Sequence, residues 1–246
     1  MKTAILSDVH ANLEALSACM AHARRLGAER FAFLGDLVGY GADPLACLDL
    51  IRGEVARGGL AVRGNHDEAA LGGLCEDLNF IARDSAYWTR TQLGAAEREF
   101  LAALPLQQRD GDALYVHASA ANPPAWEYIT GLLAAKRCLA ATDAAIVFAG
   151  HVHQPLLFYT SGDGVKSFDA RNGVAVPLSA RRRWLALLGS VGQPRDGNPA
   201  AAYALFEPAA RQLTQHRVPY DHATAARKIL AAGLPAMLAR RLAYGE

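Results

Sequence analysis

The sequence predicts an α/β fold that contains two β-sheets. Short apolar runs alternate with helical patterns over the first 63 residues, which is typical of a parallel sheet with helices packed on it. A long helical pattern occupies residues 68–104, and beyond residue 153 the sequence changes to short strands and turns. This change indicates a second, mostly antiparallel sheet formed by the later strands.

The elements of the first half follow in chain order. Residues 3–6 form a short apolar run, and apolar residues recur at helical spacing from about residue 12 to residue 26, where Gly27 is a typical helix end. The next predicted elements are a strand at residues 31–34, a helix at 44–51 and a strand at 60–63. The helical pattern that follows has an apolar face made of Leu78, Ile81, Trp88, Leu93, Phe100, Leu101 and Leu104.

The second half contains mainly predicted strands. Asp110-Gly111 is a turn between the first two of them, and Pro235 interrupts a helical tail near residues 221–244. The predicted strands are residues 106–109, 113–116, 144–149, 156–159, 165–168, 174–176, 184–188, 202–206 and 213–218. Because no linker or repeat separates these segments, we expect one domain over residues 1–246, with a helical insertion or cap near 68–104.

Composition excludes several classes of protein. The chain has 246 residues, of which 52% are hydrophobic, and a formal net charge of +1. This balance is typical of a globular protein and gives no electrostatic signature for nucleic acid or an anionic membrane. The apolar runs are shorter than the roughly 20 residues that cross a bilayer, and no signal peptide is expected. Four widely spaced cysteines without a CxxC pair indicate buried thiols of a cytoplasmic protein.

Polar residues that suit divalent cations follow the predicted strands. Asp, Asn and His offer the oxygen and imidazole ligands that such ions prefer. Since open sheets bind ligands at the carboxyl ends of their strands, we expect these side chains to form one metal site. The clusters are Asp8-Val9-His10, Gly35-Asp36, Gly64-Asn65-His66-Asp67, His117 and Gly150-His151-Val152-His153.

The chemistry of these clusters favours a phosphate. Residues i and i+2 of an extended backbone point to the same side, so Asp8 pairs with His10 and His151 with His153. Asp36 follows a glycine and is free to bridge two cations. Two divalent cations carry roughly four positive charges, and the two carboxylates neutralise roughly two of them. The remaining positive charge suits a phosphate-like anion. Two cations about 3.5–4 Å apart can hold a bridging hydroxide for in-line attack on phosphorus.

The order of the clusters over residues 8–153 resembles that of the calcineurin-like metallophosphoesterases. Residues 35–41 and 189–195 are similar to the small bacterial phosphodiesterase branch of that superfamily. The resemblance implies an α/β/β/α layered fold, a two-sheet sandwich flanked by helices, and two divalent ions of manganese, iron (Fe²⁺ or Fe³⁺) or zinc. It implies that one ion binds Asp8, His10, Asp36 and His153, and that the other binds Asp36, Asn65, His117 and His151.

Several further residues are candidates for catalysis or substrate binding. We leave His66 off the metals, because a protonated histidine beside the site can stabilise charge or protonate the leaving oxygen. Asp67 can orient this histidine. Tyr40 either lines the substrate pocket or packs beneath its loop, and Arg195 lies in a Gly/Pro-rich loop that either reaches a phosphate or forms a plain hairpin. For Tyr128, a structural role is favoured over a substrate contact.

The sequence predicts a dinuclear metal-dependent phosphoesterase that hydrolyses phosphodiester or phosphomonoester bonds of a small molecule. Gly39-Tyr40 stands where protein serine/threonine phosphatases of the superfamily carry Asp-Arg, which favours a small phosphoester. One alternative is a hydrolase of dinucleoside polyphosphates such as diadenosine tetraphosphate. A non-catalytic metal-binding scaffold is disfavoured, since a scaffold does not need the complete ligand set together with His66.

Overall fold

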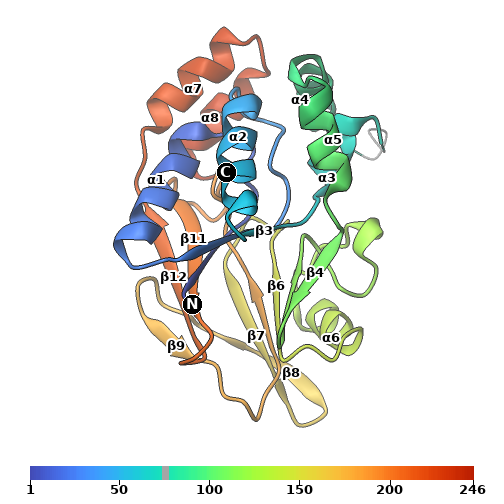
Figure 1. Cartoon of the computed structure of the whole chain (residues 1–246), viewed down its shortest axis with the longest axis vertical. Helices are drawn as coiled ribbons and strands as arrows, with labels where there is room; N and C mark the ends of the chain where they lie inside the picture. Colours follow the sequence, from blue (N-terminus) through green and yellow to red (C-terminus); the bar gives the residue numbers. More distant parts are fainter. Residues whose placement is uncertain (74–77) are drawn as a thin grey trace.

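Two mixed β-sheets packed face to face form the centre of the computed structural model, which describes residues 1–73 and 78–246 (Figure 1). The strands of the first sheet are β1 (Thr3–Leu6), β2 (Arg30–Phe33), β3 (Leu60–Ala61), β9 (Ala175–Pro177), β11 (Ala201–Glu207) and β12 (Gln212–Val218). Those of the second are β4 (Gln107–Asp110), β5 (Ala113–Val116), β6 (Ile146–Ala149), β7 (Leu156–Ser161), β8 (Gly164–Phe168) and β10 (Trp184–Leu187). Their spatial orders are β3-β2-β1-β11-β12-β9 and β4-β5-β6-β10-β7-β8.

The later strands do not form a sheet of their own, and that part of the sequence-based prediction is wrong. β11 pairs with β1 and β12 pairs with β9, so these three strands extend the first sheet, whereas β7, β8 and β10 extend the second. The physical reason is that a strand pattern encodes which face is buried but not which neighbour it pairs with. Residues 201–206 of β11 are all buried, and a strand buried on both faces belongs in the middle of a sheet.

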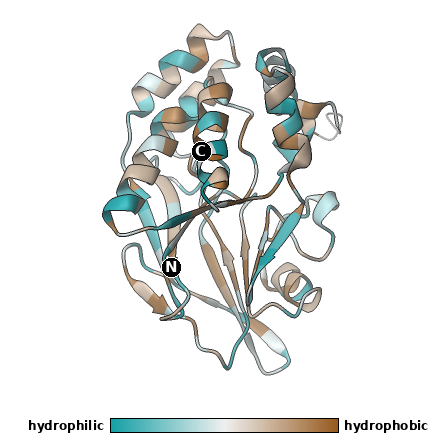
Figure 2. Ribbon diagram, viewed as in Figure 1, coloured by the Kyte–Doolittle hydropathy of each residue, from teal (hydrophilic) through white to brown (hydrophobic). Residues whose placement is uncertain are grey.

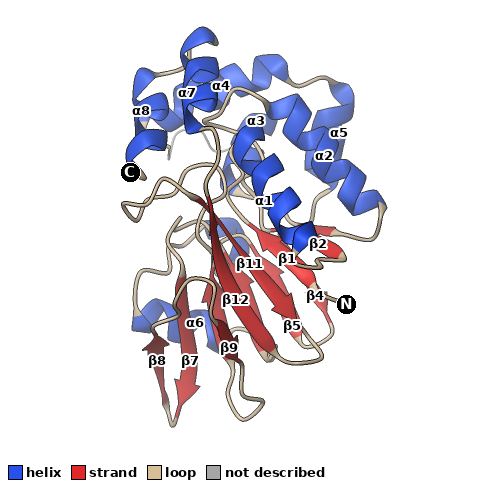
Figure 3. Cartoon of the chain, turned by 90° about the vertical axis from the view of Figure 1, so that its left-hand side faces the viewer, coloured by secondary structure: helices blue, strands red, loops and turns tan. Residues whose placement is uncertain are grey.

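Alternating side chains divide the apolar core into layers. In β1, Ala4 and Leu6 pack with the helices outside the first sheet, whereas Ile5 packs between the two sheets. Helices α1 (Leu13–Arg25) and α2 (Pro44–Ala56) cover the outer face of the first sheet, and α6 (Leu132–Ala140) covers that of the second (Figure 3). The predicted α/β/β/α layering is therefore confirmed.

The remaining helices lie near one end of the sandwich. The expected helical region at residues 68–104 contains α3 (Asn65–Leu71), α4 (Phe80–Gln92) and α5 (Ala95–Ala103). The tail forms α7 (His222–Ala231) and α8 (Ala236–Tyr244), separated near Pro235 as predicted. The sequence missed α6, because its buried face consists of only Ala135, Cys138 and Leu139 while Leu133 is exposed. No described helix has the length and apolar character needed to span a membrane.

The hydropathy of the strands depends on their position in the sheets. Figure 2 shows apolar central strands and a hydrophilic β4, whose residues Gln107–Asp110 form an edge of the second sheet. A polar edge strand discourages pairing with another chain. Among the described residues, Cys19, Cys47 and Cys138 are free and buried, as predicted, and Cys75 lies outside them.

An ion bridge connects the C-terminal helices to the start of α1 and α2. Lys228 Nζ of α7 lies 2.5 Å from Glu14 Oε1 and 2.8 Å from Asp43 Oδ2. Glu14 is in the first turn of α1 and Asp43 is the N-cap of α2. The bridge therefore brings α7 close to the loops that follow β1 and β2.

Replacing Lys228 with methionine is expected to lower the free energy of unfolding by about 1 kcal/mol, because two neighbouring carboxylates lose their cation. Burial lowers the pKa of the Lys228 amine, but hydrogen bonds to Asp43 and Glu14 outweigh this effect and raise it. A raised folded-state pKa stabilises the fold while the amine is protonated, so the effect is present at neutral pH and is lost as the pH rises above about 10.5.

Urea unfolding of Lys228→Met at about pH 7.5 and pH 11 measures this difference, with the exposed Lys136→Met as the matched control. An equal loss in both variants, or a loss that does not change with pH, would contradict the ion bridge.

Candidate metal centre

The predicted metal ligands lie in loops at one end of the sandwich and come from both sheets. The carboxylates and imidazoles among them are at most 5% exposed. The first sheet supplies Asp8, His10, Asp36 and Asn65, which follow β1, β2 and β3, and the second supplies His117, His151 and His153, which follow β5 and β6.

These side chains form two groups that share Asp36. Within each group the candidate ligand atoms lie within 4.8 Å of one another, and the groups are Asp8, His10, Asp36 and His153, and Asp36, His117 and His151. Asn65 Oδ1 lies 3.0 Å from His117 Nε2 and so adjoins the second group. The structure thus brings together all the predicted ligands in the division that the sequence resemblance implies.

The loops that carry these ligands have an unusual backbone. Non-glycine residues with positive φ cost roughly 1–3 kcal/mol each and collect at functional sites. Most such residues in the described chain belong to the ligand loops: Asp8, His10, Ala11, Asp36, Tyr40, His151 and His153. The surrounding structure must therefore hold these unfavourable backbone conformations in place.

Glycines let the loops approach closely. A Cβ at Gly64 would lie 2.3 Å from Asp36 Oδ1, and a Cβ at Gly150 would lie 1.8 Å from Ser7 Oγ and 2.7 Å from Asp8 Oδ2. All three contacts are shorter than real Cβ atoms make. The glycines of the Gly-Asn-His and Gly-His motifs are therefore required by packing, not only by turn geometry.

Backbone carbonyls fix the orientation of three imidazoles. A carbonyl only accepts hydrogen bonds, so an imidazole Nδ1 beside it donates, and the Nε2 of that ring keeps its lone pair for a ligand. The pairs are His117 Nδ1 with Leu34 O at 2.7 Å, His153 Nδ1 with Gln193 O at 2.5 Å and His10 Nδ1 with Val38 O at 3.4 Å.

The donor atoms fit divalent cations. His10 Nε2 and His153 Nε2 lie 3.1 Å apart, close to the roughly 3.3 Å expected for two imidazole nitrogens on one tetrahedral ion. Asp36 Oδ2 is buried, has no hydrogen-bond partner, and faces His117 Nε2 at 3.4 Å. Buried acceptors that converge in this way need a cation or a proton between them.

Burial and mutual charge set the protonation of the site. Burial lowers the pKa of His10 and His153, and that of His151 to about 3, so these rings are neutral and able to bind a cation. Burial also lowers the pKa of His117, but the Asp36 carboxylate outweighs it and raises the pKa to about 9. In the protein alone, a proton on His117 therefore balances Asp36, and a bound cation would displace it.

Asp67 supports the Asp36 loop and does not contact the His66 ring in any described hydrogen bond. Its carboxylate accepts from the backbone N–H groups of Leu37, Val38 and Gly64 at 2.9–3.2 Å. Burial raises the pKa of Asp67 to about 7, and the nearby Asp36 adds to this increase. Three amide donors make Asp67 the residue that fixes the loop between Asp36 and Tyr40.

His66 lies beside the ligands and is held by packing. Its backbone N–H donates to Asp36 Oδ1 at 2.8 Å, and its ring contacts those of Tyr40 and His10 at centroid distances of 4.3 and 4.9 Å. Nδ1 is buried without a hydrogen-bond partner. A Cβ at Gly39 would lie 2.7 Å from that nitrogen, so this position leaves no room for an acidic partner.

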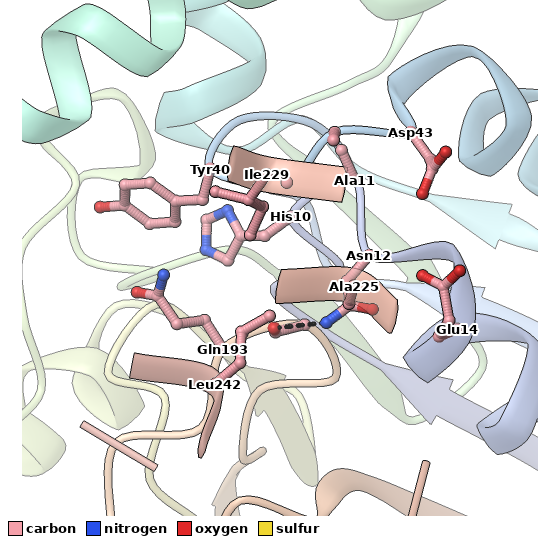
Figure 4. Close-up of a pocket in the computed structure, with 13 residues that line it drawn as sticks. His10, Ala11, Asn12, Glu14, Tyr40, Asp43, Gln193, Ala225, Ile229 and Leu242 are labelled. Atoms are coloured by element: carbon pink, nitrogen blue, oxygen red, sulfur yellow. Dashed lines mark hydrogen bonds between the residues drawn. The ribbon is translucent and has the colours of Figure 1, made fainter. Parts of the chain in front are cut away.

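Tyr40 and Arg195 form a wall beside the first group of ligands. Tyr40 is buried against the His10 ring and packs with the C-terminal helices, and Figure 4 shows it next to His10 and near Gln193. The Arg195 guanidinium lies 5.7 Å from the Tyr40 ring centroid and donates to Gln193 Oε1 at 3.0 Å. The structure therefore places both residues at the site.

The sequence did not assign roles to Ser190 and Gln193, which support the first group. Ser190 Oγ donates to Asp8 O at 2.8 Å and accepts from Gln193 N at 2.8 Å. The backbone carbonyl of Gln193 accepts a hydrogen bond from His153 Nδ1 and so orients that ring. The only available signal was the similarity of residues 189–195 to a branch of the superfamily, since contacts made by the backbone have no residue-type signature.

This combination of fold and buried Asp/His cluster defines a metal-dependent phosphoesterase. Residues 1–211 match the calcineurin-like phosphoesterase superfamily domain. The chain belongs to that superfamily.

Similar proteins match along the whole chain. A crystal structure of a metallophosphoesterase from Sphaerobacter thermophilus has 41% identity and a TM-score of 0.89, and the match covers 100% of this chain and 99% of that one. Uncharacterized protein MJ0912 of Methanocaldococcus jannaschii is 34% identical over 99% of this chain and 98% of its own. Hypothetical protein PH1004 from Pyrococcus horikoshii OT3 shares the fold, with 18% identity, a TM-score of 0.79 and coverage of 100% and 98%.

We expect the protein to bind about two equivalents of Mn²⁺ per chain, measured by elemental analysis and isothermal titration. Asp36→Asn is expected to bind less than one equivalent, because it removes the shared carboxylate. Asp49→Asn, on the exposed side of α2, is the matched control and is expected to retain wild-type binding. Full metal content in Asp36→Asn would contradict the shared-ligand arrangement.

Proposed function

We propose that the protein is a cytoplasmic enzyme that hydrolyses phosphodiester or phosphomonoester bonds of a small molecule at a dinuclear metal centre. The observation that supports this most is the sharing of buried Asp36 by two groups of ligands. Two carboxylates among neutral donors leave bound divalent cations with an excess of positive charge, which suits a phosphate. When bound, such cations polarise phosphoryl oxygens and lower the pKa of a water nucleophile.

Arg195 is suited to hold a phosphate oxygen. One side of its guanidinium donates to Gln193 and lies over the Tyr40 ring, while its Nε is buried without a hydrogen-bond partner. A planar, always charged guanidinium gives directed hydrogen bonds to phosphate. Tyr40 and Gln193 therefore position Arg195 beside the site.

His66 is suited to protonate the leaving oxygen. Burial lowers its pKa, and the Asp36 carboxylate opposes that effect. A phosphate anion bound beside the ring would raise this lowered pKa and so favour the protonated imidazole, which can pass its proton to the leaving oxygen. Asp67 contributes as a positioning residue, since its bonds to Leu37 N and Val38 N hold the Asp36 loop in place.

A hydrolysis panel tests the proposal. Protein loaded with manganese, iron or zinc is assayed on aryl phosphomonoesters, aryl phosphodiesters, cyclic nucleotides and dinucleoside polyphosphates. We expect turnover of mono- or diesters that falls by about 10²-fold or more in Asn65→Ala, because this change removes a donor of the second group. Equal activity of wild type and Asn65→Ala would contradict the dinuclear centre. Metal binding without turnover of any substrate would favour the scaffold alternative.

Replacing His66 with glutamine should separate its role from that of the metal ligands. We expect wild-type metal content, a fall in kcat of about 10²–10⁴-fold on alkyl phosphodiesters, and a smaller fall on nitrophenyl esters, whose leaving group needs no proton. His222→Gln, at the start of α7, is the control. Unchanged rates on alkyl phosphodiesters would remove His66 from the mechanism.

A further inference from the structure

A cavity adjoins the second group of ligands and has no role in the function proposed above. Its volume is about 210 Å³, and its lining includes Asn65 and His151 together with Glu68, Trp126 and Tyr128. Ligand sites for drug-sized molecules measure about 300–1,000 Å³, so this smaller cavity suits a single ring system. It opens directly onto two of the candidate metal ligands.

Two aromatic side chains, Trp126 and Tyr128, line this cavity. The Tyr128 ring is stacked on the His151 imidazole at a centroid distance of 4.0 Å, yet Tyr128 remains 56% exposed. Trp126 meets the His117 ring edge-on at 5.8 Å. Each aromatic side chain therefore contacts an imidazole of the second group and still lines open space.

Two prolines restrict the backbone that leads to Trp126. Pro123 and Pro124 begin a short 3₁₀ turn that ends at Trp126, where φ is 52° and ψ is 37°. A left-handed conformation at a bulky residue costs about 1–2 kcal/mol, and such strain collects at ligand-binding positions. The strained backbone at Trp126 thus places the indole beside the metal ligands.

The described lining of the cavity offers no cation to a second phosphate. Glu68 contributes a carboxylate, whose Oε2 lies 3.1 Å from Arg63 Nε, and no lysine or arginine is among the described residues that line the cavity. The guanidinium suited to phosphate, that of Arg195, contacts Tyr40 and Gln193 beside the first group of ligands. A neutral planar group with N–H donors fits this lining, because aromatic faces stack on it and a carboxylate accepts from it.

We propose that this cavity binds the nucleobase of a nucleotide phosphoester, stacked on Trp126 and Tyr128 while its phosphate lies over the metal ligands. The proposal rests on the proposed function and specifies its substrate class. Base stacking on aromatic side chains changes affinity by on the order of tenfold per base. No sequence pattern pointed to Trp126, and for Tyr128 the sequence favoured a structural role.

The first experiment measures binding without turnover. Manganese-loaded protein is titrated with a phosphonate analogue of AMP, whose carbon–phosphorus bond is not hydrolysed, and with the matching ribose phosphonate that lacks the base. We expect the base to tighten binding about tenfold, and this ratio to fall towards one in Trp126→Leu and in Tyr128→Leu. Trp126→Phe should recover most of it, and Tyr244→Leu, an exposed tyrosine of α8, should leave it unchanged.

A base effect near one in the wild-type protein, or an unchanged effect in both leucine variants, would overturn the nucleobase site. The second experiment compares kcat/KM for methyl esters of AMP and of ribose 5-phosphate. Hydrolysis of both esters without preference overturns the nucleobase site and leaves the proposed function intact. Base-dependent binding without hydrolysis of any ester supports the nucleobase site and contradicts the proposed function.

Discussion

The buried carboxylate of Asp36 is the constraint on which the site depends. Its Oδ1 accepts the His66 backbone N–H, and its Oδ2 faces His117 Nε2 at 3.4 Å and His10 Nε2 at 3.7 Å. Burial opposes its charge, but the imidazoles of His117 and His66 outweigh burial and hold its pKa well below the usual value. A buried anion must be compensated, so the surrounding loops have to present positive charge, either as a proton on His117 or as bound cations.

This constraint explains why the scaffold is built from two sheets. The residues that face Asp36 follow strands of both sheets, and several hold a left-handed backbone that is unfavourable on its own. Strained loops persist only when their ends are fixed. Here the loop ends are fixed by fully buried strands such as β1, β5 and β6, and Asp67 fixes the loop between Asp36 and Tyr40 from inside.

What the sequence predicted, and what it did not, follows from how each feature is encoded. Asp8, Asp36 and the paired histidines were predictable because metal binding needs particular side chains at strand ends. The sheet membership of β7 to β12 was not, because strand periodicity carries no information on long-range pairing. Gln193 was missed for a related reason, since it orients His153 with a backbone carbonyl that any residue could supply. Trp126 was missed because a lone aromatic residue after a proline pair is common in loops.

The two sides of the site differ in a way that bears on substrate orientation. Arg195 and His66 both contact Tyr40 beside the first group of ligands, whereas the aromatic cavity adjoins Asn65 and His151 of the second. In the proposed complex, a phosphate bound over the shared Asp36 would have one ester oxygen towards His66 and another towards the cavity. With a nucleobase in the cavity, the nucleoside is the part that stays on phosphorus, and the ester nearest His66 is the one that leaves. The proposed binding mode would therefore suit a substrate with two ester groups, and it extends the proposed function towards phosphodiesters.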